Sequence, residues 1–124
     1  MAKEYCCSNG HMKYAGTHLI LEFWEAKNIN SIPKIKKTFR DAIKACGATL
    51  LRMDMHKFTP YGGVSGMAII SESHFSIHSW PEYNYAAIDI FVCGTVDPYQ
   101  ALPALKKGFQ TEKVQVVDLK RGIF

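Results

Sequence analysis

The chain has 124 residues, a formal net charge of +4 at pH 7, 48% hydrophobic residues and 21% charged residues. This length suits one domain, and the composition excludes a disordered, collagenous or coiled-coil chain. The positive charge is small and dispersed, and solvated helix faces explain it more simply than a nucleic-acid surface. We therefore expect no nucleic-acid partner.

The four cysteines do not predict a disulfide framework, because no CxxC spacing occurs and Cys6 is adjacent to Cys7. Lys3 and Glu4 interrupt any apolar signal region at the start of the chain. The sequence also lacks the run of about 18 apolar residues that crosses a membrane. We expect a cytoplasmic protein with reduced thiols and no membrane partner.

The apolar pattern predicts elements in the order β-α-β-β-β-β-α-β, after a loose arm over residues 1–15. Alternation and β-branched or aromatic content mark the strands. The expected strands cover residues 16–26, 48–58, 64–71, 73–80, 85–93 and 113–119.

Two helices are expected between these strands. Apolar residues recur at three- and four-residue spacing over residues 31–46, and Ser31 is a suitable N-cap. Asp97 and Pro98 form a good helix start, with aspartate as the cap and proline in the first position. Pro103 interrupts this second helix, so a kink or a late start is expected.

Strands outnumber helices, and short loops join several of them. This pattern predicts an α+β fold, a two-layer α/β sandwich with a mainly antiparallel sheet and helices on one face. The second face of such a sheet has no helices to bury it and needs another surface to pack against. A second copy of the chain is the obvious candidate.

Reactive side chains are concentrated between Gly62 and Gly94. They are Ser65, Ser71, Glu72, Ser73, His74, His78, Glu82 and Cys93. Imidazole and thiolate groups bind zinc, so His74 and His78 with Cys93 or Glu72 are one candidate ligand set. The HxxxH spacing in a strand does not place three ligands together, and we expect no metal. A Cys93 nucleophile activated by His78 is a second interpretation, set against a cysteine that only packs.

The run GVSGMAIISESHFSIHSWPEYNYAAIDIFVCG, residues 63–94, resembles the centre of the small prokaryotic S-adenosylmethionine decarboxylases. These are pyruvoyl-dependent enzymes of polyamine synthesis. The pattern ESH…IH.WPEY…D.F.CG is specific to that family. The opening strand GTHLILEF and the order of elements also fit, so the resemblance covers most of residues 16–120.

This resemblance implies that the chain is a zymogen that cleaves itself between Glu72 and Ser73. The Ser73 hydroxyl would attack the Glu72 carbonyl carbon and convert the amide into an ester. A β-elimination would then release residue 72 as a carboxylate. Hydrolysis of the Ser73 remnant would leave a covalent pyruvoyl cofactor, with a β chain of residues 1–72 and an α chain of residues 73–124.

The family's processing residues match Ser65 and His78. Ser65 is expected to hydrogen-bond the oxyanion or ester intermediate, and His78 to remove the Cα proton during elimination. The pyruvoyl carbonyl derived from Ser73 would form a Schiff base with the substrate amine and act as an electron sink. Cys93 matches the thiol that returns a proton to the substrate carbon.

Two further positions match the family's substrate contacts. Glu82 corresponds to the glutamate that holds the ribose hydroxyls, since two acceptor oxygens suit a vicinal diol. Phe58 lies where an aromatic ring stacks on adenine and attracts the sulfonium cation. The loop TPYGG is one residue longer than the family pattern, and Asn84 replaces a common glycine.

The resemblance therefore predicts S-adenosylmethionine decarboxylase activity that supplies the aminopropyl donor for spermidine. It also implies a homodimer of processed protomers, (αβ)2, with sites at the subunit interface. Relatives that decarboxylate arginine or ornithine share the self-processing motif and remain an alternative. A non-enzymatic α+β dimer that binds a ligand or a metal is a further alternative, which predicts an intact chain.

Overall fold

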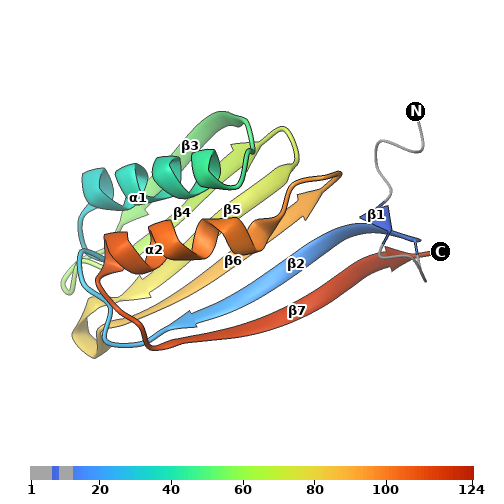
Figure 1. Cartoon of the computed structure of the whole chain (residues 1–124). Helices are drawn as coiled ribbons and strands as arrows, with labels where there is room; N and C mark the ends of the chain where they lie inside the picture. The colour runs from blue at the N-terminus through green and yellow to red at the C-terminus, as the bar shows by residue number, and fades with distance from the viewer. Residues whose placement is uncertain (1–6, 9–12) are drawn as a thin grey trace.

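A computed structural model of the chain describes residues 7–8 and 13–124. Its strands form one sheet, and two helices lie side by side across one face of it (Figure 1). The strands are β1 (Cys7–Ser8), β2 (Lys13–Phe23), β3 (Leu50–Lys57), β4 (Val64–Ile70), β5 (Ser73–Trp80), β6 (Tyr85–Cys93) and β7 (Val114–Ile123). The helices are α1 (Ile32–Ala45) and α2 (Leu102–Phe109), with short 3-10 helices η2 (Pro81–Tyr83) and η3 (Pro98–Ala101).

The sheet has the order β1-β2-β6-β5-β4-β3, and β7 pairs with β2. Every pairing is antiparallel. The prediction of an α+β sandwich with helices on one face is therefore confirmed. No helix in the described part of the chain is long and apolar enough to cross a membrane.

The helix starts follow the predicted capping chemistry. Ser31 Oγ accepts a hydrogen bond from the backbone N–H of Lys34, so α1 begins as expected. Asp97 caps η3 by accepting from the Tyr99 N–H. The α-helix proper begins only at Leu102, which puts Pro103 in its first turn, where a proline lacks no needed hydrogen bond. The late start is confirmed.

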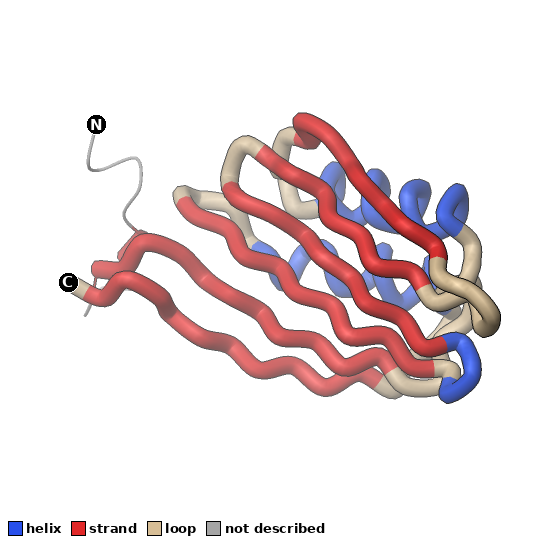
Figure 2. Tube along the Cα trace, turned by 180° about the vertical axis from the view of Figure 1, so that it is seen from behind, coloured by secondary structure: helices blue, strands red, loops and turns tan. Residues whose placement is uncertain are grey.

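The core lies between the helices and the facing side of the sheet. Alternate residues of β5 and β6 point into it, including the fully buried Phe75, Ile77 and Ile90. None of the helices formed by the described residues lies on the other side of the sheet, as the view from behind shows (Figure 2). We call this uncovered side the open face.

Two boundaries differ from the sequence prediction. β2 begins at Lys13, inside the segment expected to be a loose arm, because residues 14–23 pair with β7. The rest of that arm lies mostly outside the described residues. β7 continues to Ile123, past the expected end at residue 119. Its backbone pairing with β2 extends it although most of its side chains are exposed.

Candidate functional site

Ser65 and His78 form a hydrogen-bonded pair on the open face. They are direct partners in the β4–β5 ladder, so the antiparallel register places their side chains side by side. Ser65 Oγ and His78 Nδ1 are 2.9 Å apart. This distance lets the pair exchange or share a proton.

A cavity of about 260 Å³ adjoins this pair and contains both predicted substrate contacts. Phe58, Glu82, Ser65 and His78 all line it. The Phe58 N–H donates to the Gly63 carbonyl at 2.7 Å and closes the TPYGG loop. The structure thus brings together four of the predicted site residues at one end of the sheet.

Glu72, Ser73 and Cys93 meet at the opposite end of the sheet. Ser71 and Glu72 form the turn between β4 and β5, and Ser73 opens β5 with φ +139°. The Cys93 N–H donates a hydrogen bond to the Glu72 carbonyl oxygen at 2.9 Å. The carbonyl of the expected cleavage site is therefore already polarised by a backbone donor.

One copy of the chain keeps these two groups of residues apart. Ser73 pairs with Ile70, whereas His78 pairs with Ser65, five residues further along β5. At roughly 3.3 Å per residue, this separation is about 17 Å. Ser65 and His78 therefore cannot reach Ser73 within the same chain.

A polar network that the sequence analysis missed occupies the middle of the open face. Asp89 lies close to two side chains, with 3.3 Å from its Oδ1 to His18 Nε2 and 3.2 Å from its Oδ2 to Ser76 Oγ, which donates to it. Burial lowers the pKa of the neighbouring His74, and the charges of His18 and Arg121 act in the same direction. Asp89 is the aspartate of the pattern D.F.CG quoted above, so the sequence did contain a signal that could have identified it as a site residue.

The metal alternative has no ligand set in the part of the chain that the structure describes. No group of three or more histidine, cysteine, aspartate or glutamate side chains there can hold a metal ion. His74 and His78 lie four residues apart on one extended strand, so about 13 Å of strand separates them.

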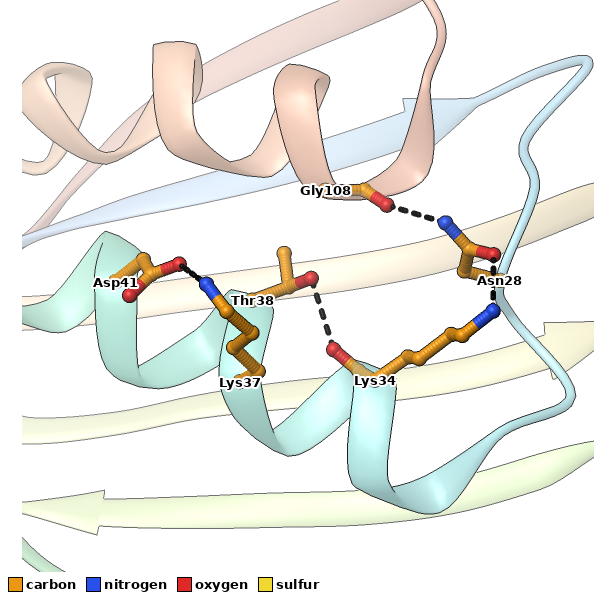
Figure 3. Close-up of polar contacts among 6 residues, drawn as sticks. All are labelled: Asn28, Lys34, Lys37, Thr38, Asp41 and Gly108. Atoms are coloured by element: carbon orange, nitrogen blue, oxygen red, sulfur yellow. Dashed lines mark hydrogen bonds and ion pairs between the residues drawn. The ribbon is translucent and has the colours of Figure 1, made fainter.

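A lysine-rich groove of about 400 Å³ lies on the helix layer, between α1 and α2. Several of its polar groups contact one another (Figure 3). Asn28 Nδ2 donates to the Gly108 carbonyl, and Lys34 Nζ donates to Asn28 Oδ1. Lys37 donates to Asp41 at 2.8 Å. These contacts tie the helices and the loop before α1 together, away from the open face.

A sequence model of the family described as S-adenosylmethionine decarboxylase matches residues 17–122. The chain is 50% identical over 115 residues to an S-adenosylmethionine decarboxylase proenzyme of Methanococcus maripaludis, covering 90% of this chain and 93% of that protein. It is 44% identical over 113 residues to a proenzyme of the same name from Thermomicrobium roseum, covering 90% and 97%.

A solved structure, the adenosylmethionine decarboxylase of Aquifex aeolicus, superposes with a TM-score of 0.79 at 25% sequence identity. The superposition covers 88% of this chain and 92% of that chain. Sequence and fold therefore agree, and the chain belongs to the S-adenosylmethionine decarboxylase family.

Proposed function

We propose that this chain is a proenzyme that cleaves itself between Glu72 and Ser73 and then decarboxylates S-adenosylmethionine, giving the aminopropyl donor for spermidine. The backbone of Ser73 carries the proposal, because its φ is +139°. Substituents on Cα lie about 120° apart around the N–Cα bond, so this φ turns Cβ to within about 20° of the Glu72 carbonyl carbon.

That orientation is the one required for attack by the serine. At the negative φ of an ordinary residue, Cβ points away from the preceding carbonyl carbon, and Oγ cannot approach it. At Ser73 a rotation about χ1 brings Oγ to the Glu72 carbonyl carbon through a five-membered ring. The strained backbone therefore holds the reacting atoms close to an attack geometry.

The backbone N–H of Cys93 supports the same step. Attack by Ser73 Oγ places negative charge on the Glu72 carbonyl oxygen, which already accepts a hydrogen bond from this N–H. A donor fixed before the reaction stabilises that charge without reorganising. Breakage of the Glu72–Ser73 amide then leaves residue 72 joined through an ester to Ser73 Oγ.

The elimination step needs a base at the Ser73 Cα, and we propose His78 of the partner subunit. Within one chain His78 lies about 17 Å along the strand from Ser73. A two-fold dimer through the open faces, with its axis running across the strands, places each end of one sheet over the opposite end of the partner's sheet. Exposed apolar residues support burial of this face, among them Met67, Ile69, Val117 and Leu119.

We propose the homodimer (αβ)2 on this basis, with the β chain 1–72 and the α chain 73–124. Ser65, paired with His78 at 2.9 Å, positions the imidazole and hydrogen-bonds the oxyanion or the ester. Each site then combines Ser73 and Cys93 of one subunit with the Ser65–His78 pair of the other.

A pyruvoyl group fits the position of Ser73, which is half-buried beside Cys93 and can be generated from the chain itself. Such a group supplies an electron sink for loss of carbon dioxide. We assign to the Cys93 thiol the return of a proton to the substrate carbon. Glu82 and Phe58 line one cavity, where they hold the ribose hydroxyls and stack on the adenine.

Carboxyl-labelled substrates test the proposed activity. The purified chain is expected to release labelled carbon dioxide from S-adenosylmethionine and not from arginine or ornithine, because Glu82 and Phe58 suit a nucleoside. The Ser73→Ala variant, which cannot form the ester, is the control. Release from arginine or ornithine alone would contradict the proposed substrate.

A further inference from the structure

The side chain of Glu72, next to the proposed cleavage point, is bonded to a segment distant in sequence. Glu72 Oε1 accepts a hydrogen bond from the Thr49 N–H at 3.0 Å. The Thr49 carbonyl in turn accepts from the Ser71 N–H at 2.9 Å. The segment between α1 and β3 thus binds the β4–β5 turn through the backbone N–H and the carbonyl of Thr49.

We infer that the Glu72 carboxylate is a positioning residue for self-cleavage, acting through its hydrogen bond with the Thr49 N–H. The inference rests on the proposed function, which it deepens. Glu72 contributes its carbonyl carbon to the reaction. Its side chain touches no reacting atom and instead positions that carbonyl carbon. The pair Glu72–Thr49 and the pair Glu72–Cys93 together hold the cleaved peptide on two sides.

The reason lies in the backbone of Ser73. A positive φ at a residue other than glycine persists only where the surroundings hold it. The C-terminal side of Ser73 is fixed by its ladder partners Ile70 and Val92. The N-terminal side is fixed by Glu72, through its carbonyl and its side chain.

Loss of the side-chain bond leaves only one of the two contacts of Glu72. The turn can then relax toward an ordinary backbone, which rotates Cβ of Ser73 away from the Glu72 carbonyl carbon. A charged acceptor makes a stronger hydrogen bond than a neutral one. The first chemical step, formation of the ester, is therefore the one that depends on this contact.

The test compares Glu72→Ala, Glu72→Gln and a matched control, Glu112→Ala, in the full chain. Glu112 is a carboxylate 86% exposed in its side chain, 3.7 Å from Lys106 and remote from the turn. Rates of self-cleavage are followed from freshly made precursor on denaturing gels. We expect Glu72→Ala to cleave about tenfold more slowly, Glu72→Gln to stay within about threefold of wild type, and Glu112→Ala to match it.

Hydroxylamine, which cleaves esters, identifies the step that is slowed. In Glu72→Ala the uncleaved chain is expected to stay resistant to hydroxylamine, because the ester forms slowly. Accumulation of a hydroxylamine-sensitive ester would overturn the inference, as would equal slowing in Glu72→Gln and Glu72→Ala. If wild type cleaves and Glu72→Ala cleaves at the same rate, the inference is overturned and the proposed function stands. A wild-type chain that does not cleave would overturn the proposed function.

Discussion

Ser65 Oγ lies 2.9 Å from His78 Nδ1 across the β4–β5 ladder, at the end of that hairpin remote from Ser73. The pair is preformed in a single chain, and so is the contact between the Cys93 N–H and the Glu72 carbonyl. Each chain therefore carries both halves of the proposed site, but the two halves lie apart within one chain. This separation is the reason for proposing a dimer that joins the halves.

Mixed dimers test that arrangement. Ser73→Ala and His78→Ala chains, with different tags, are co-expressed and the dimers bearing both tags are isolated. The His78→Ala chain is expected to cleave in these dimers, because its Ser73 meets His78 of the partner subunit. Homodimers of either variant are expected not to cleave fully. Denaturing gels of the tagged chains give the result.

The control pairs His78→Ala with Ser65→Ala. Both changes lie in the same half of the site, so no site in this mixed dimer is intact. We expect no gain in cleavage over the parent variants. A His78→Ala chain that stays uncleaved beside Ser73→Ala would show that each chain supplies its own base.

The positive φ of Ser73 predicts a stability difference between two variants that cannot cleave. Glycine adopts φ +139° without the Cβ penalty that alanine retains. We expect Ser73→Gly to be more stable than Ser73→Ala by about 1 kcal/mol, a rise of several degrees in melting temperature. Thermal unfolding measures it. Equal or lower stability of Ser73→Gly would mean that the chain does not hold Ser73 in this conformation.

The proposal gives Cys93 two separable roles. Its backbone N–H contacts the Glu72 carbonyl, and its thiol is the proposed proton donor in decarboxylation. Cys93→Ala is therefore expected to cleave itself while its turnover of S-adenosylmethionine falls by about 100-fold or more. Cys46→Ala, at the buried C-cap of α1, is the control and should keep turnover. Turnover by Cys93→Ala at the wild-type rate would show that the thiol takes no part in the reaction.

The contact between Tyr99 and Asp118 predicts a pH-dependent contribution to stability. Tyr99 Oη donates to Asp118 Oδ2 at 2.7 Å and ties η3 to β7. This hydrogen bond raises the pKa of Tyr99 to about 12. A raised pKa in the folded state stabilises the fold below pH 10, and that contribution is lost as the pH rises toward 12.

Tyr99→Phe is therefore expected to be less stable than wild type by about 1 kcal/mol at pH 8. The difference should shrink as the pH rises from 10 toward 12, which urea unfolding at several pH values measures. Tyr61→Phe, at an exposed tyrosine, is the control. A difference that stays constant with pH would exclude the Tyr99 hydroxyl as its source.

The elements and the family were predictable from the sequence for local reasons. Apolar spacing and a Ser31 cap define α1, and Pro103 in a first turn explains the late start of α2. Asn84 replaces a common glycine but adopts φ +52°, a left-handed conformation that asparagine tolerates. The motif around Ser73 also identified the family from residue types alone.

The arrangement of the site was not predictable in the same way. Ser65 and His78 lie within eight residues of Ser73 in sequence, yet an extended strand carries them about 17 Å away. Glu72, which precedes Ser73, is held by hydrogen bonds from Thr49 and Cys93, which approach from a loop and from another strand. Long-range contacts of this kind leave no local pattern in the sequence.

An intact mass spectrum under denaturing conditions tests self-cleavage, the central claim, most directly. The 14.0 kDa chain is predicted to give two fragments, residues 1–72 at roughly 8 kDa and residues 73–124 at roughly 6 kDa in proportion to their lengths. The smaller fragment should carry a ketone at its N-terminus. A single species of 14.0 kDa from freshly purified, correctly folded wild-type protein would contradict cleavage at Glu72–Ser73.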